Sequence, residues 1–175
     1  MARAATATQP KGTGSKSGKL DLPLQRSVGY QVRMTHRRLQ RFLQSKIEPF
    51  GVTLGMWYYL RILWNEDGLT QRELSRRIGS MEPTTLTALL SMERSGLVRR
   101  VRNRGDRRKM NVHLTKKGRE LEVKLLPLAV EVVETATAGL SRREVDGFLR
   151  LLHLMQRNLE ARFDLASAPP ESESI

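Results

Sequence analysis

Apolar residues recur at helical spacing along almost the whole 175-residue chain, and this pattern is interrupted once, between residues 97 and 114. There, two short apolar runs flank Asn103–Asp106, a glycine-containing segment typical of a β-hairpin turn. Capping residues and glycines delimit six helices around this hairpin. The expected helices cover about residues 24–51, 54–66, 71–78, 82–95, 116–139 and 142–163. The order α-α-α-α-β-β-α-α predicts a mainly helical fold with one small hairpin.

Residues 52–115 are predicted to form a winged helix-turn-helix lobe. A short helix, a turn at Gly79 and a second helix precede the hairpin, and the second helix of such a pair enters the major groove of DNA. Thr85, Ala88, Leu89 and Met92 are spaced to form its buried side. The candidate DNA contacts on the opposite side and at its end are Pro83, Thr84, Thr87, Ser91 and Arg94.

The positive charge of the chain is concentrated around this lobe. Residues 69–119 carry fourteen basic and four acidic side chains, a net charge of +10 out of +13 for the whole chain. Residues 120–175 have a net charge of −4. A basic surface of this density favours a polyanion such as nucleic acid, although a merely solvated surface is the alternative interpretation.

The hairpin tip, residues 102–109, carries five cations in eight positions. A basic ribbon beside a recognition helix is suited to the minor groove, where a narrow A·T stretch attracts Arg. The candidate contacts are Arg104, Arg107, Arg108 and Lys109. Asp106 is expected to hold the hairpin through an Arg, Arg108 in particular, rather than to touch DNA.

Three segments resemble the MarR family of bacterial transcription regulators: LTQRELSRRIG, EPTTLTALLSMERSGLVRR and GDRRKMNVHLTKKG. The resemblance spans about residues 27–163 and implies a homodimer that binds double-stranded DNA and places Arg107 in the minor groove. Many members carry a base-contacting Arg where this chain has Thr87, and Ser91 or Arg94 is expected to compensate. The resemblance also implies a small-molecule effector bound between the first helices and the DNA-binding lobe.

The outer helices, residues 22–51 and 116–165, are expected to form a dimerisation bundle. Residues 116–165 carry apolar stripes too broad for one small lobe to cover, although a compact monomer is the alternative. A two-fold dimer would read a pseudo-palindromic operator.

Aromatic residues gather between positions 30 and 64. The resemblance makes their surroundings a candidate effector site for a small aromatic carboxylate or an acyl thioester such as an acyl-CoA. The candidate residues are Arg33, Arg37, Trp57, Tyr58, Arg61 and Trp64. Core packing for the aromatic residues and solvated helix surface for the arginines are the alternatives.

Other classes of protein are disfavoured. The absence of Cys excludes a disulfide framework, thiolate metal ligands and the thiolate-based peroxide sensors of the resembling family. The three His residues are scattered, so neither an enzyme nor a metal or cofactor site is expected. No segment is long and apolar enough to span a membrane. Residues 1–21 are expected to be a disordered basic arm and residues 166–175 a disordered tail.

The chain is therefore expected to be a cytoplasmic, nucleoid-associated transcription regulator, acting as a repressor that an effector releases. The alternative function is an architectural nucleic-acid-binding protein without effector control.

Overall fold

The computed structural model describes residues 23–167, so the predicted arm and most of the predicted tail lie outside the described residues. The chain divides between His36 and Arg37 into two units, which are described separately. Within residues 23–167, no helix has both the length and the apolar content that crossing a bilayer requires.

The N-terminal segment consists of two helical pieces rather than one continuous helix. A 3-10 turn, η1 (Leu24–Arg26), is followed by helix α1 (Val28–Ile47). The prediction of a single helix from residue 24 was therefore wrong. Ser27 separates the two pieces with an extended backbone, and its hydroxyl accepts a hydrogen bond from the Tyr30 N–H at 3.4 Å.

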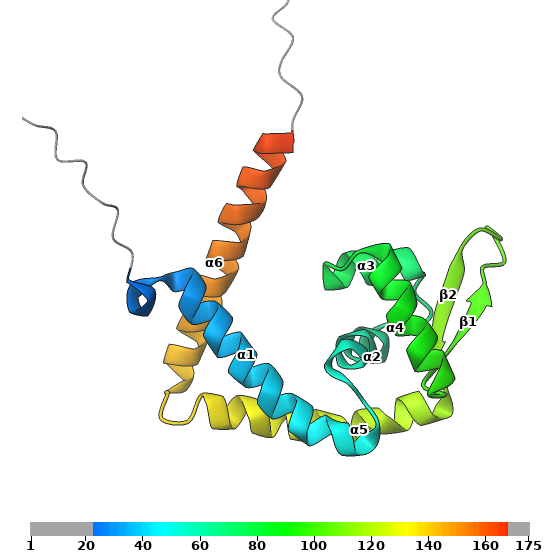
Figure 1. Cartoon of the computed structure of the whole chain (residues 1–175), viewed down its shortest axis with the longest axis horizontal. Coiled ribbons are helices and arrows are strands. Elements are labelled where there is room, and N and C mark those ends of the chain that lie inside the picture. The colour runs from blue at the N-terminus through cyan, green and yellow to red at the C-terminus, as the bar shows by residue number, and fades with distance from the viewer. Residues whose placement is uncertain (1–22, 168–175) are drawn as a thin grey trace, which may run out of the picture. The chain divides into compact units, whose positions relative to one another are not determined.

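After α1, a second 3-10 turn, η2 (Glu48–Phe50), ends at Gly51, whose φ of 72° is in the left-handed region that favours glycine. The remaining elements follow the predicted order (Figure 1). They are α2 (Leu54–Asn65), α3 (Gln71–Ile78), α4 (Glu82–Arg94), β1 (Val98–Arg102), β2 (Met110–Leu114), α5 (Lys116–Ala136) and α6 (Arg142–Ser167). The mainly helical winged helix-turn-helix prediction is confirmed.

Two predicted boundaries differ from the structure. Helix α5 ends at Ala136 rather than near Gly139, because Thr137 leaves the helical backbone conformation and its hydroxyl donates to the Val133 carbonyl at 2.9 Å. Helix α6 continues to Ser167, beyond the predicted end at Phe163 and into the first residues of the predicted tail.

Polar caps fix the starts of four helices where the sequence predicts them. The hydroxyls of Thr53 and Thr115 accept hydrogen bonds from backbone N–H groups in the first turns of α2 and α5. Thr70 and Glu73 form the predicted capping box of α3, and the Ser141 and Glu144 side chains bond each other's backbone N–H groups at α6.

The core of the lobe lies where α2, α3, α4 and the hairpin meet, and α5 closes it. Leu60, Leu74 and Leu89 are fully buried there, one from each of the first three helices. Val112 of β2 and Leu125 of α5 complete the same core. Burial of these side chains fixes the orientation of α4, since its apolar side must face inward.

Helix α5 approaches the hairpin through a glycine. A Cβ added to Gly118 would lie 2.2 Å from the carbonyl oxygen of Leu97, well inside the shortest distance that real Cβ atoms reach. The same carbonyl accepts a hydrogen bond from the Thr115 N–H at 3.0 Å. The first turn of α5 therefore packs directly on the backbone that precedes β1.

Candidate nucleic-acid interface

The turn between α3 and α4 is set by Gly79, which ends α3 with a φ of 69° in the left-handed region. The chain then enters α4 at Glu82. In the middle of the lobe, the Tyr59 hydroxyl lies 3.1 Å from the Thr85 hydroxyl, and both side chains are buried. Because Thr85, Leu89 and Met92 are all buried, the opposite side of α4 faces solvent.

The structure places most of the candidate contacts of α4 on this solvent side. Pro83, Thr84, Thr87 and Arg94 are exposed, whereas Ser91 is half-buried. The Thr87 hydroxyl donates to the Pro83 carbonyl at 3.1 Å. Thr87 therefore keeps its oxygen lone pairs and methyl group for an incoming ligand, while its proton is already engaged.

Strands β1 and β2 pair antiparallel, from Val98 opposite Leu114 to Arg102 opposite Met110. Beyond this last pair, the Asn103 N–H donates to the Lys109 carbonyl at 2.9 Å and closes the loop. Loop and strands together form the wing, defined here as residues 98–114.

Asp106 organises the tip of the wing as predicted. Its carboxylate accepts hydrogen bonds from the backbone N–H and the Nε of Arg108, at 3.1 and 3.3 Å, and Lys109 Nζ lies 3.7 Å away. The two Arg108 hydrogen bonds are the main reason that the pKa of the Asp106 carboxyl is lowered below its ordinary value. The carboxylate is therefore ionised at neutral pH and holds Arg108 and Lys109 in place.

Arg104 and Arg107 are exposed, and neither forms an ion pair with any side chain in the part of the chain that the structure describes. A protruding guanidinium without a carboxylate partner keeps its full positive field in solvent. Arg99 and Arg102 of β1 are also exposed and form no ion pair among the described residues, so four wing cations are available to a polyanion.

The wing is also tied to the lobe by residues that the sequence analysis missed. The Asn103 side chain accepts from the Gly105 and Asp106 N–H groups and donates to Asn111 at 2.9 Å. Asn111 in turn donates to the Gly68 carbonyl at 2.6 Å. An Asn two residues before Gly105 is a turn signal that could have identified the first contact, but the link to Gly68 depends on the tertiary fold.

A second missed anchor is Asp67, after α2. Its carboxylate accepts hydrogen bonds from the Leu114 N–H and from Arg119 of α5, both at 2.8 Å. On the other edge of the wing, Glu93 of α4 pairs with Arg100 of β1 at 2.9 Å, and hydrogen bonds from Arg100 lower the pKa of Glu93. The wing is therefore fixed from both sides.

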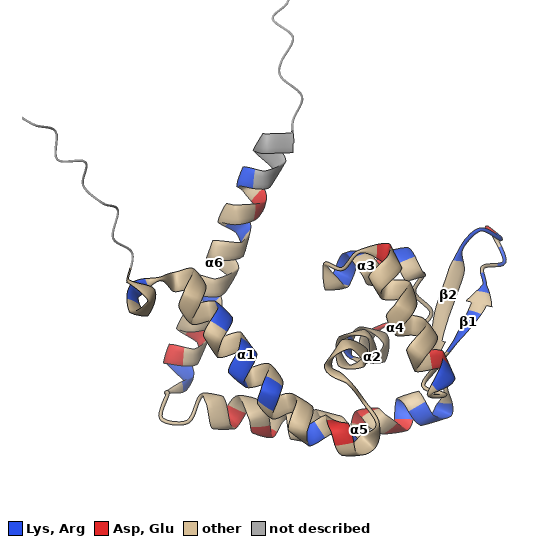
Figure 2. Ribbon diagram, viewed as in Figure 1, with Lys and Arg blue, Asp and Glu red and all other residues tan. Residues whose placement is uncertain are grey.

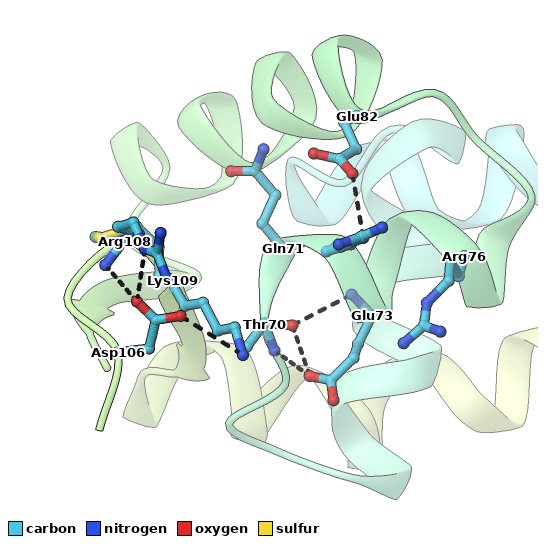
Figure 3. A pocket seen from close by; sticks show the side chains of 10 residues that line it. Thr70, Gln71, Glu73, Arg76, Glu82, Asp106, Arg108 and Lys109 are labelled. Atoms are coloured by element: carbon cyan, nitrogen blue, oxygen red, sulfur yellow. Dashed lines mark hydrogen bonds and ion pairs between the residues drawn. The ribbon is translucent and has the colours of Figure 1, made fainter. Parts of the chain in front are cut away.

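Lys and Arg residues concentrate on the wing, on α3 and in the first turn of α5, whereas acidic residues become frequent farther along α5 (Figure 2). The wing and the starts of α3 and α4 enclose an open polar hollow of about 710 Å³ (Figure 3). It contains Arg72 of α3, 3.8 Å from Glu82 of α4, and Lys109 of the wing. The start of α4, helix α3 and the wing thus share one charged surface.

The candidate effector residues are only partly brought together. The Trp57 and Trp64 rings meet edge to face with centroids 5.6 Å apart, and the Arg61 guanidinium lies 5.7 Å from the Trp57 ring centroid. Trp57 is buried and the Trp64 indole N–H donates to the Gly118 carbonyl at 2.9 Å, so both rings pack the core.

The remaining candidates are Tyr58, Arg37 and Arg33. Tyr58 is 37% exposed on α2. Arg37 lines an open hollow of about 540 Å³ together with Gln44 and Leu54, which does not include the tryptophans. Arg33 is an exposed residue of the N-terminal unit. The structure thus assembles Trp57, Arg61 and Trp64 but does not group Arg37 with them.

The histidines do not form a site. His36 and His153 are exposed, and His113 packs on Gly68, with its Nδ1 4.0 Å from Asp67. Among the described residues, no three His, Asp or Glu side chains are arranged to hold a metal ion.

Comparison with known proteins agrees with this geometry. Residues 52–110 match the model of the MarR family. The chain is 34% identical over 137 residues to the HTH-type transcriptional regulator TtmR of Methylorubrum extorquens, covering 77% of this chain and 68% of that protein.

Solved structures give the same result. A MarR transcriptional regulator from Methanosarcina mazei Go1 is 31% identical, with a TM-score of 0.71 over 75% of this chain and 94% of that one. The S. aureus MepR–DNA complex is 27% identical, with a TM-score of 0.72 over 76% of this chain and 98% of that one. With these relatives and with a basic wing beside an exposed recognition helix, the chain belongs to the MarR family of winged helix-turn-helix transcription regulators and is not an enzyme.

Proposed function

We propose that this regulator binds a pseudo-palindromic DNA operator as a homodimer and represses transcription until a small effector releases it. The observation that carries the DNA-binding part is the wing beside the exposed side of α4, where Arg104 and Arg107 protrude and have no carboxylate partner within residues 23–167. The similarity to MepR, whose structure is a DNA complex, supports the same surface. Such a regulator would work on the nucleoid, in the cytoplasm.

The two parts of the surface are suited to two grooves. Helix α4 has the diameter to enter the major groove with its N-terminal residues against the base edges. The wing then lies beside it, where Arg107 and Arg104 would reach the neighbouring minor groove. Asp106 holds Arg108 and Lys109, and their proposed contacts are phosphates rather than bases.

The homodimer is supported by apolar side chains that the single chain leaves in solvent. No residue of α6 from Arg142 to Arg162 is fully buried, yet this helix exposes a set of large apolar side chains. They are Phe148, Leu149, Leu151, Leu154, Met155 and Leu159. On α5, Val123, Val130 and Val133 are also more than half exposed. A second copy would bury these faces and place two α4 helices about one turn of DNA apart.

The proposed effector is a small aromatic carboxylate or an acyl thioester. Support comes from Arg61, an exposed cation over the Trp57 ring, since a guanidinium on an aromatic wall can pair with a carboxylate or phosphate. Arg37 and Tyr58 remain proposed contributors. The effector releases DNA only to the extent that it binds the DNA-incompetent arrangement more tightly than the competent one.

The test is operator binding by the purified chain, measured by fluorescence anisotropy on a duplex from its own promoter region with excess competitor DNA. Arg107→Ala is expected to weaken binding to every duplex and to reduce the salt dependence by about one ion per wing. Arg143→Ala, on α6, removes the same charge away from the wing and serves as the control. An Arg107→Ala affinity within twofold of the parent's at all salt concentrations would show that the wing is not in the interface.

The effector is tested on the same complex. Aromatic carboxylates and acyl thioesters are added singly, and at least one is expected to release the operator from the parent chain and to act more weakly on Arg61→Ala. Arg38→Ala, an exposed arginine of α1, is the control. If no compound of either class releases DNA, the effector assignment fails and an architectural role is favoured.

A further inference from the structure

Met81 is the most exposed large apolar side chain of the DNA-binding lobe. Its exposed fraction is 76%, against 37–39% for Tyr58, Leu90 and Val101. It lies at the N-cap of α4, the helix proposed to enter the major groove. A long thioether is thus presented to solvent at the tip of the recognition helix.

A methionine is an unusual residue at the N-cap of a helix. Ser, Thr, Asp and Asn are preferred at an N-cap because their oxygen bonds a free backbone N–H, a contribution of about 1 kcal/mol. Helices α2, α3 and α5 each have a Thr there that makes such a bond. Met81 makes none. Neither capping nor core packing therefore accounts for the side chain.

The neighbouring side chains limit how α4 can read bases. Residues 81–93 contain no Arg, Lys, Asn or Gln, so the first three turns cannot make the bidentate contacts that identify guanine or adenine. Glu82 is the only carboxylate of the first turn, and it lies 3.8 Å from Arg72. The other exposed groups at the start of α4 are the Met81 thioether, the Pro83 ring and the methyl and hydroxyl groups of Thr84.

In the major groove, the group that an apolar side chain distinguishes is the C5-methyl of thymine. We propose that Met81 reads a thymine in each operator half-site by packing on this methyl, and that the pattern of thymines is a principal source of specificity at the start of α4. The inference rests on the proposed DNA-binding function and deepens it by naming a residue and its base.

The experiment replaces thymidine by deoxyuridine, one position at a time, in the duplex protected by the full-length protein in its own promoter region. Uracil lacks only the methyl group, so base pairing is retained. For the parent chain, at least one position per half-site is expected to lose about fourfold in affinity, the factor that corresponds to one buried methylene-sized group.

Two variants test whether Met81 is responsible for this loss of affinity. Met81→Ser supplies a preferred N-cap, so the fold is expected to be retained, and thymine and uracil duplexes should bind it equally at the sensitive position. Met81→Leu keeps an apolar side chain and should retain the difference. Thermal unfolding of each variant confirms that the lobe is intact.

Other outcomes overturn the inference. A thymine-to-uracil ratio unchanged in Met81→Ser, or the absence of any sensitive thymine, would exclude Met81 as a reader. If the ratio disappears only in Thr84→Ser, the methyl is read by Thr84 instead. Failure of the proposed function is a separate result, because the parent chain would then show no preference for the promoter duplex over competitor DNA.

Discussion

At the scale of single residues, the packing of the lobe depends on a few close contacts in which another side chain would not fit. Gly118 lies against the Leu97 carbonyl, and the Thr85 hydroxyl meets that of Tyr59 inside the core. A polar pair that is buried and satisfied fixes one arrangement of the helices that carry it. These residues are buried, and they position the side chains that are proposed to face DNA.

Gly118→Ala is expected to destabilise the protein by about 3 kcal/mol, the upper end of overpacking effects, because a backbone carbonyl cannot move aside like a side chain. Urea unfolding measures the change. Gly55→Ala is the control, since the nearest atom to its added Cβ is 3.8 Å away. That variant should be neutral or gain up to about 1 kcal/mol. Equal stabilities for the two variants would contradict the packing described for α5.

Much of the residue-level prediction came from local sequence. Capping boxes at Thr70 and Ser141 and the Asp106–Arg108 contact join residues two or three positions apart, so the sequence shows both partners. Asp67–Arg119 spans 52 positions and Asn111–Gly68 spans 43, and no local pattern indicates such pairs. Met81 was missed because an apolar residue before a helix suggests burial, whereas the fold leaves it exposed.

At the scale of elements, the wing combines a rigid base with a charged tip. Asp67 and Glu93 hold its two strands against the lobe, and Asp106 holds its tip against the mutual repulsion of the cations. The effect of a charge change at the wing tip on DNA affinity therefore depends on the positions of the cations as well as on the net charge.

Asp106→Asn is expected to weaken operator binding at least severalfold, although it makes the protein more positive, because Arg108 and Lys109 lose their anchor. Asp146→Asn on α6 adds the same charge elsewhere and should leave affinity unchanged or slightly higher. Anisotropy titrations at two salt concentrations measure both variants. Tighter binding by Asp106→Asn would mean that net charge, and not the shape of the wing, controls affinity.

The capping box of α3 makes part of the stability dependent on pH. Hydrogen bonds from the Thr70 hydroxyl and backbone N–H lower the pKa of Glu73 below its ordinary value of 4.5. This contribution is therefore complete above pH 4.5 and is lost as pH falls through the lower folded-state pKa. Glu73→Gln should be less stable than the parent at pH 7, and the difference should shrink as the pH falls below 4.5. A difference in urea midpoint that stays constant from pH 7 to pH 3 would contradict this.

The boundaries of elements show what local patterns cannot specify. Periodicity placed Leu24 on the same stripe as Val28 and Val32, yet Ser27 caps a separate helix. Helix α6 continues past Phe163 because no Gly or Pro interrupts residues 164–167. Element order is determined by long apolar patterns, whereas ends depend on single hydrogen bonds.

At the scale of the whole molecule, charge and apolar surface are segregated along the chain. The basic residues concentrate on the lobe, while the exposed apolar side chains concentrate on α5 and α6. This separation suits a molecule that binds DNA with one part and its own copy with another.

Leu151→Lys is expected to shift the protein toward monomer at micromolar concentration, because a charge would be buried in the proposed helix bundle. Operator affinity should fall with it, since two linked half-site contacts are lost. His153→Lys, two residues along α6 and on a different side of the helix, is the control. Sedimentation velocity measures the oligomeric state. A parent chain that sediments as a monomer would remove the paired half-site arrangement.

Footprinting of the promoter region shows whether two copies of the α4–wing surface bind one duplex. We expect protection of two half-sites about 10 base pairs apart, with two chains bound per duplex and affinity that falls steeply as salt is raised. Absence of any protected segment at micromolar protein and low salt would contradict this arrangement.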